Sequence, residues 1–136
     1  WTVRHLIIGA TRGWARGVQM WNLALDENHG PHRGGCKDCR GVVTIDSATG
    51  TVTRNLEYYA LAHASKFVRP GARRIASTAG SDGLDTVAFR NADDGSIALI
   101  VCNSASSERR FALRSAGRTL HTALARESIA TYVWRP

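Results

Sequence analysis

The chain has 136 residues, of which 43% are apolar and 21% are charged, and its net charge is +7. This length is enough for one domain with a buried core, but it excludes a complete (β/α)8 barrel, which needs about 250 residues. The longest apolar run, residues 97–102, is far too short for a transmembrane segment, and the basic residues are scattered without a run of five, which argues against a nucleic-acid partner.

The first half of the chain has the pattern helix, strand, loop, helix. Apolar residues recur at helical spacing over residues 4–15 and again over 56–67, and predict a helix in each place. The apolar run 18–25 between them predicts a strand that is buried on both faces of a parallel sheet. Residues 26–41 form a polar, glycine-rich loop, and loops of this length are usually functional. Residues 42–53 have the pattern of a short hairpin.

After Gly71 the apolar pattern changes to a period of two, which is typical of strands. Short strands are predicted near residues 73–78, 84–91, 96–103, 108–114, 119–125 and 128–134. Tight turns such as Asp93-Asp94-Gly95 join them, so this half predicts a small antiparallel β-sandwich. We therefore divide the chain into residues 1–71 and residues 72–136.

Acidic residues offer no clear catalytic pair. A glycosidase needs two carboxyl groups that face each other, about 5–5.5 Å or 6.5–9.5 Å apart. Asp26 and Glu27 follow the predicted strand, where barrel active sites lie, but neighbours in an extended chain point in opposite directions. We interpret them as loop and turn residues and assign no catalytic residue.

Two histidines and two cysteines lie close together in the polar loop: His29, His32, Cys36 and Cys39. This set could bind tetrahedral zinc, although its order and spacing differ from those of common zinc fingers. A disulfide between Cys36 and Cys39 would instead close the glycine-rich loop in an oxidising compartment. A redox pair or free thiols are further alternatives. We favour the disulfide, and we expect no metal and no cofactor.

Trp21 and Asn22 are the candidate ligand-binding residues. A tryptophan at the end of a barrel strand can present a flat face to a sugar ring, and the amide beside it can bind hydroxyl groups. The alternative is that Trp21 is a core residue. We expect the other three tryptophans to lie in the core: Trp1, Trp14 and Trp134. His63 is expected to be a packed, hydrogen-bonded residue of the second helix.

Several separated segments resemble glycoside hydrolase family 30, the glucosylceramidase-like family. In chain order they are Trp21 to Asp26 with Gly30-Pro31, the loop 34–41, Tyr58 to Gly71, Val87 to Phe89, Asp94 to Ser96, and Ser128 to Trp134. Because these segments occur in the family's order, the resemblance covers essentially the whole chain. It implies the fold class: mixed α and β, with the end of a (β/α)8 barrel over residues 1–71 followed by an antiparallel β-sandwich over residues 72–136.

The resemblance also implies a role for this chain. The family's two catalytic glutamates follow the fourth and seventh barrel strands, so both would lie upstream of Trp1. Trp21 matches the family's tryptophan that lines the sugar subsite, and Asn22 is a weaker match. We therefore expect the carboxyl-terminal portion of a retaining β-glycoside hydrolase, which supplies a subsite wall and a structural β-sandwich. A non-catalytic carbohydrate-binding module and a small zinc-binding domain are the alternatives.

The same resemblance implies partners and a location. The substrate would be a β-glycoside or oligosaccharide, as in carbohydrate or sphingolipid metabolism. Residues 1–67 carry apolar surface that needs cover, so we expect the missing barrel segment or a second copy of the chain to bind there, or these residues to collapse onto the sandwich. We expect secretion, because bacterial members of the family are commonly exported. A first residue other than Met suggests a processed, trimmed or partial chain.

Overall fold

The computed structural model describes all 136 residues. Its helical layer consists of a π-helical segment η1 (Thr2–Gly9), the short α1 (Ala10–Arg12) that continues it, and α2 (Leu56–Ser65). The first helix was predicted over residues 4–15, and it ends earlier because Trp14 adopts a left-handed backbone conformation with φ 70°. The helix predicted over residues 56–67 begins as expected and ends at Ser65.

All six strands predicted after Gly71 are present, with bounds that differ by a few residues at most. They are β4 (Arg73–Ile75), β5 (Leu84–Arg90), β6 (Ile97–Asn103), β7 (Arg109–Ser115), β8 (Arg118–Leu124) and β9 (Ser128–Trp134). One sheet has four strands in the order β4-β5-β6-β9, and the other is the β7-β8 hairpin. Every pairing in both sheets is antiparallel, as predicted for a sandwich.

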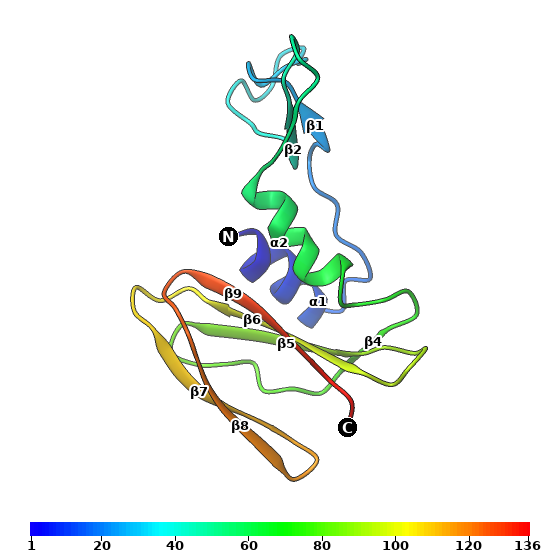
Figure 1. Ribbon diagram of the computed structural model, residues 1–136, viewed down its shortest axis with the longest axis vertical. Coiled ribbons are helices and arrows are strands. Elements are labelled where there is room, and N and C mark those ends of the chain that lie inside the picture. Colours follow the sequence, from blue (N-terminus) through cyan, green and yellow to red (C-terminus); the bar gives the residue numbers. More distant parts are fainter.

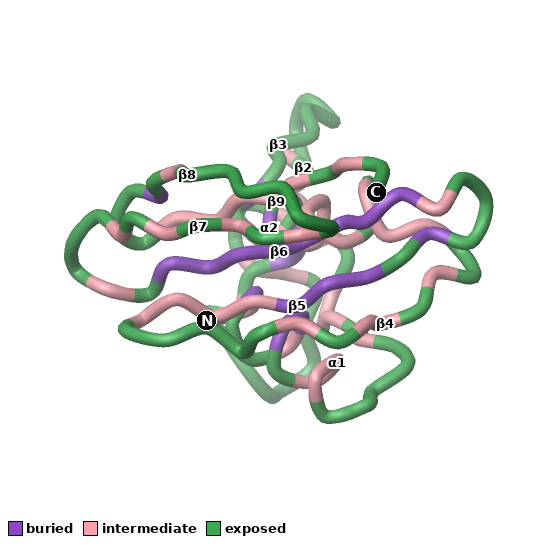
Figure 2. The backbone as a smooth tube through the Cα atoms, turned by 90° about the horizontal axis from the view of Figure 1, so that it is seen from below, coloured by how far each residue is buried: buried purple, intermediate pink, exposed green.

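The helices and the two sheets of the sandwich form three layers, with the four-stranded sheet in the middle (Figure 1). The helices η1 and α2 cover one face of this sheet, and the β7-β8 hairpin lies on the other side. Every residue of β6 is buried, and the most deeply buried stretch of backbone follows β5 and β6 (Figure 2). β6 therefore carries apolar side chains on both faces from Ile97 to Cys102, since both faces are covered.

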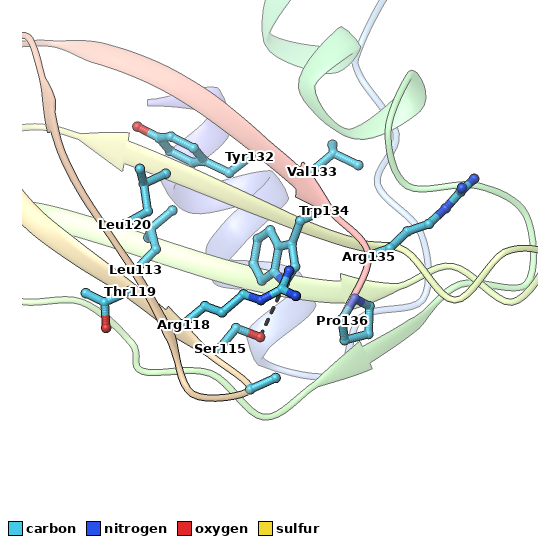
Figure 3. A pocket seen from close by; sticks show the side chains of 11 residues that line it. Leu113, Ser115, Arg118, Thr119, Leu120, Tyr132, Val133, Trp134, Arg135 and Pro136 are labelled. Carbon is cyan, nitrogen blue, oxygen red and sulfur yellow. Dashed lines mark hydrogen bonds between the residues drawn. The ribbon is translucent and has the colours of Figure 1, made fainter.

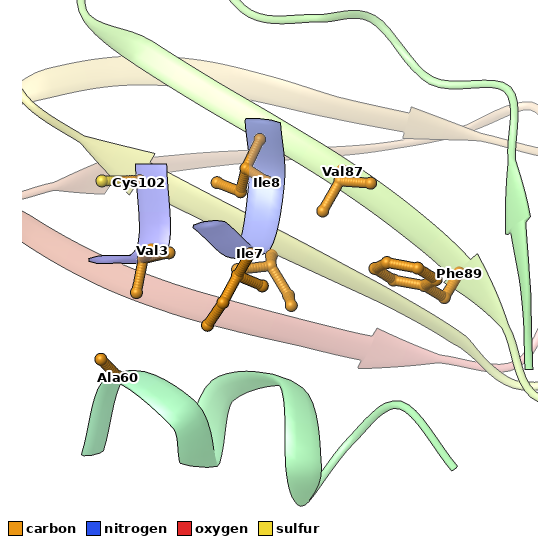
Figure 4. Packing of buried hydrophobic residues seen from close by; sticks show 8 residues of the cluster. Val3, Ile7, Ile8, Ala60, Val87, Phe89 and Cys102 are labelled. Atoms are coloured by element: carbon orange, nitrogen blue, oxygen red, sulfur yellow. The ribbon is translucent and has the colours of Figure 1, made fainter. Parts of the chain in front are cut away.

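The core between the helices and the sheet contains residues from both halves of the chain (Figure 4). Its buried residues are Val3, Ile7, Ile8, Ala60, Val87, Phe89, Ile100 and Cys102. The division between residues 71 and 72 therefore separates two segments of sequence that share one hydrophobic core. Asn91 adds a polar link across the same division, because its Nδ2 donates to the Phe67 carbonyl at 3.0 Å and its Oδ1 accepts from the Arg69 amide at 2.9 Å.

The second core lies between the two sheets of the sandwich. Its fully buried members are Ala88, Leu99, Val101 and Leu124. Side chains of the hairpin and of β9 complete it, and the rings of Phe111 and Tyr132 meet edge to face with centroids 6.1 Å apart. This geometry is favourable for aromatic pairs, and it joins the two layers.

The region of the long apolar run differs most from its prediction. Only Ala24–Leu25 form a strand, β1, which pairs in parallel with β2 (Val43–Ile45), and β2 pairs with β3 (Val52–Arg54). The expected strand over residues 18–25, buried on both faces, is wrong for this chain, because Trp21 is 82% exposed and Leu23 is 74% exposed. β1 has a hydrogen-bonded neighbour on one edge only, so the residues before it have no second strand to pair with.

Two of the tryptophans expected in the core are on the surface. Trp1 is 80% exposed and Trp14 is 75% exposed, whereas Trp134 is partly buried beside the second core. Apolar spacing predicted the helix correctly, but which face is covered depends on the position of the sheet. None of the helices is long and apolar enough to cross a membrane.

His63 is packed between α2 and β9, where its Nδ1 lies 3.0 Å from the Thr131 hydroxyl. The structure confirms the expected hydrogen bond, and burial lowers the pKa of His63 below its ordinary value of 6.5. A lowered pKa means that the unfolded chain binds the proton more strongly than the folded chain. The stability that comes from neutral His63 is therefore present above about pH 6.5 and is lost as the pH falls below it.

We expect the free energy of unfolding to decrease between pH 7 and pH 5, and the substitution His63→Asn to make this decrease smaller. Asparagine can keep a polar contact to Thr131 but takes up no proton in this range. Urea unfolding at both pH values measures the effect, with His32→Asn in the exposed loop as the matched control. An equal pH dependence in His63→Asn and in the unchanged chain would contradict the prediction.

Candidate functional site

Trp21 lies on the surface shortly before β1, and the residue is 82% exposed. The Asn22 side chain turns back onto its own chain, where its Oδ1 accepts a hydrogen bond from the Ala24 amide at 3.2 Å. Asn22 also lines a hollow of about 460 Å³ between residues 18–20, Leu23, Val42 and Leu61, and Trp21 is not part of its wall. Trp21 is therefore free to contact a ligand with its ring, while the Asn22 amide oxygen already holds the local backbone.

The loop after β1 begins with a tight turn that Asp26 organises. Asp26 Oδ1 accepts hydrogen bonds from the amides of Asn28 at 2.9 Å and Gly30 at 2.7 Å. The Asp26 amide in turn donates to the Gly30 carbonyl at 2.8 Å. Asp26 thus has the turn-forming role expected from the sequence.

Glu27 connects the start of this loop to the turn between β2 and β3. The Ser47 hydroxyl donates to Glu27 Oε1 at 2.5 Å, and the Ser47 amide donates to Oε2 at 2.9 Å. These bonds, led by the one from the hydroxyl, hold the pKa of Glu27 below its usual value. Glu27 is therefore ionised and hydrogen-bonded at neutral pH, which suits an anchor and not a proton donor.

The structure joins Cys36 and Cys39 by a disulfide within the exposed part of the loop. His29 points to the Cys39 carbonyl oxygen, 3.1 Å from its Nδ1, and not to a cysteine sulfur. No group of three or more His, Cys, Asp or Glu side chains is placed to hold a metal ion. The loop ends at Arg40, whose guanidinium forms an ion pair with Glu57 of α2 at 3.0 Å.

These anchors were not found from the sequence. Glu27 and Ser47 are separated by 20 residues, and Arg40 and Glu57 by 17, so no local spacing pattern connects them. The charges of Arg40 and Glu57 were visible, but only the fold brings them together. The result is a loop fixed at both ends, with the disulfide between the two anchors, and β1 separates this loop from Trp21.

A second concave surface lies in the sandwich, between the β7-β8 hairpin and β9 (Figure 3). It has a volume of about 350 Å³, and the rings of Tyr132 and Trp134 form part of its wall. The Trp134 indole N–H donates to the Ser115 hydroxyl at 3.3 Å, and Leu113 and Leu120 line the hairpin side. The aromatic side chains of this surface, Tyr132 and Trp134, thus belong to strand β9 of the sandwich.

The structure thus combines helices and a β-sandwich in one chain. Its candidate site consists of an exposed tryptophan and a loop that is anchored at both ends. Residues 71–132 match the glycosyl hydrolase family 30 beta sandwich domain. The chain thus carries the β-sandwich domain of glycoside hydrolase family 30, the family that the shared segments indicated. The resemblance and the fold class that it implied are confirmed.

Individual relatives agree with this assignment. An endo-1,6-beta-D-glucanase of Neurospora crassa is 36% identical over 135 residues, which cover 93% of this chain and 28% of that protein. The lysosomal acid glucosylceramidase of Mus musculus is 32% identical over 137 residues, which cover 96% of this chain and 25% of that protein.

Solved structures give the same result. An endo-beta1,6-glucanase matches with a TM-score of 0.87 and 34% identity, and the match covers 99% of this chain and 30% of that one. SrfJ of Salmonella typhimurium matches with a TM-score of 0.78 and 31% identity, over 85% of this chain and 26% of that one. The chain thus spans less than a third of the length of each of these relatives.

Proposed function

We propose that this chain is the carboxyl-terminal portion of a retaining β-glycoside hydrolase, in which it supplies a wall of the sugar subsite and a structural β-sandwich. The observation that carries the proposal is that Trp21 is exposed and precedes β1, the strand that leads into a loop anchored at both ends. Its similarity to family 30 glycosidases over nearly its full length supports the same role.

In this proposal the catalytic glutamates belong to the parent enzyme outside these 136 residues. One glutamate attacks the anomeric carbon, and the other protonates the leaving oxygen and then activates water. The acidic residues of the candidate site have other partners, since Asp26 holds a turn and Glu27 is bound to Ser47. The residues of this chain therefore bind and orient sugar without taking part in bond cleavage, and the 136 residues alone are expected to be inactive.

For the substrate we propose a β-1,6-linked glucan. The Neurospora relative and the solved structure with the TM-score of 0.87 are both named as endo-1,6-β-glucanases. Glucosylceramide, which would place the parent enzyme in sphingolipid metabolism, is the second candidate because of the mouse relative. Hydrolysis of each substrate by the parent enzyme distinguishes the two.

The substitution Trp21→Ala in the parent enzyme is expected to lower kcat/KM for its glycan by about 30-fold, which corresponds to about 2 kcal/mol of lost binding to the transition state. Most of the change should appear as a higher KM, because stacking is made with substrate and transition state alike. Trp21→Phe keeps a flat apolar face and should retain most of the activity.

Trp1→Ala is the matched control, because Trp1 is 80% exposed and lies outside the loop. Its kcat/KM should stay within about twofold of the unchanged enzyme. A Trp21→Ala enzyme with unchanged KM and kcat would contradict the subsite role.

The pocket at Tyr132 and Trp134 favours a second function, that of a non-catalytic carbohydrate-binding surface on the sandwich. The two functions predict that different substitutions weaken the binding of glucan. Trp134→Ala would weaken binding of the chain to insoluble glucan if the sandwich binds sugar, whereas Trp21→Ala would do so if the subsite binds it.

We also propose that the parent enzyme is secreted, as the disulfide in an exposed loop suits an oxidising compartment. The partner that covers the exposed Leu23 before β1 is then the remaining barrel of the parent enzyme, which leaves the Trp21 ring open to the sugar, as the share of the relatives that this chain spans suggests. A second copy of the chain is the alternative, and sedimentation of the 136 residues at several concentrations tests it.

A further inference from the structure

A large cavity lies where the first helical segment and the residues after it meet the end of α2 and the edge strand β4, and Ile7 and Phe89 of the helix–sheet core form part of its wall. Its volume is about 980 Å³. Four arginines line it, namely Arg16, Arg69, Arg73 and Arg74, and no aspartate or glutamate does. Such a cavity has a strong excess of positive charge and resembles the sites where proteins hold anions.

These arginines differ in how many of their side-chain N–H donors have a partner in the protein. Arg69 pairs with Asp93 and Asp94, so its charge is already balanced. The side chains of Arg16 and Arg74 form no hydrogen bond or ion pair with another residue, and the Arg74 Nε is buried without a partner. A guanidinium carries five N–H donors, so these two side chains retain unused donors at the cavity wall.

Trp14 holds the Arg74 side chain in place. The guanidinium carbon of Arg74 lies 3.8 Å from the centroid of the Trp14 ring, which is a cation–π contact. Trp14 itself has a φ of 70°, a conformation that is uncommon for a bulky residue and tends to occur at functional sites. The stacked guanidinium leaves its edge free, and this planar edge is the part that binds oxyanions with two parallel bonds.

We propose that this cavity is an oxyanion-binding site, in which Arg74 and Arg16 bind the phosphate or carboxylate group of a ligand. The Ser65 hydroxyl, which also lines the cavity, supplies a further donor from the end of α2. The site is separate from Trp21 and the loop 26–41, which line neither the cavity nor its rim. It does not depend on the proposed glycosidase function.

The test is titration of the 136-residue chain with inorganic phosphate at constant ionic strength, followed by the NMR signals of the Trp14 indole N–H and the Arg74 Nε–H. A parallel titration with glucuronate distinguishes a phosphate from a sugar carboxylate as the source of the anion. We expect a saturable shift of both signals with at least one of the two anions. Arg74→Gln and Arg16→Gln should each weaken binding at least tenfold.

Arg126→Gln is the matched control, because it removes the same charge from an exposed position outside the cavity, and its affinity should stay within twofold. Chemical shifts of the β5 and β6 amides report whether each variant is folded, and Arg16→Gln tests the site without altering a strand. Equal weakening in Arg126→Gln and Arg74→Gln, or shifts that do not saturate with either anion, would overturn the proposal. So would a parent enzyme whose Trp14 signal is unaffected by both anions, because the cavity would then be filled by protein.

Discussion

Replacing Ile100 by alanine is expected to lower the free energy of unfolding by about 3 kcal/mol. Ile100 is 0% exposed and lies in β6, and it belongs to the cluster in which η1 and α2 meet the sheet. Removal of its outer carbons leaves a cavity that the packed helices cannot fill, so the cost includes lost contacts as well as lost burial. The helices should loosen with the sheet, since one core serves both.

Ile45→Ala is the control for this substitution, because Ile45 is 39% exposed and lies outside both clusters. It should cost less than about 1 kcal/mol. Urea unfolding followed by circular dichroism and by tryptophan fluorescence gives both values. If Ile100→Ala loses no more stability than Ile45→Ala, or if the helix and sheet signals of Ile100→Ala unfold in separate steps, the shared core is disproved.

Replacing Asn103 by alanine is expected to cost about 3 kcal/mol, although the residue is polar. Asn103 is 0% exposed. Its Nδ2 lies 2.9 Å from the Ser107 carbonyl oxygen, 3.0 Å from that of Leu124 and 2.9 Å from that of Ala125. Its Oδ1 accepts from the Ala105 amide at 3.0 Å. The side chain thus joins the end of β6 to both connections of the hairpin.

Alanine would leave these backbone groups without partners, and each buried unpaired group costs about 1–3 kcal/mol. Asn28→Ala is the matched control, because Asn28 is exposed and its side-chain amide makes one contact, from Nδ2 to Glu27 Oε1 at 3.4 Å. It should change stability by less than about 0.5 kcal/mol. The same urea unfolding measures both variants, and equal stabilities would show that Asn103 does not hold the hairpin to the sheet.

Several parts of the fold could be predicted from local sequence. The alternation of apolar residues gave β9 over residues 128–134 with its observed bounds, and it gave the other five sandwich strands to within a few residues. Asn55 directly precedes α2, but its side chain donates to the Gly41 carbonyl and the Thr44 hydroxyl and does not cap the helix. These successes share a cause: strand alternation and helical spacing are repeated within one segment and need no distant partner.

Other parts of the fold depended on neighbouring elements that the local sequence pattern does not identify. The run 18–25 is apolar enough for a central strand, but a strand exists only where another strand pairs with its backbone, and only Ala24–Leu25 have one. Trp14 has the spacing of a core residue, yet the left-handed turn that ends the helix directs it to the surface, over Arg74.

The sequence by itself determined the order of the elements, the antiparallel sandwich and the relation to glycoside hydrolase family 30, because these depend on local periodicity and on short segments in a fixed order. Tertiary structure alone decided that η1 and α2 share a core with β5 and β6, that Glu27 and Arg40 anchor the loop beside Trp21, and that Arg74 stacks on Trp14. Each of these contacts joins residues far apart in the chain, and only the path of the folded backbone brings such residues within reach of one another.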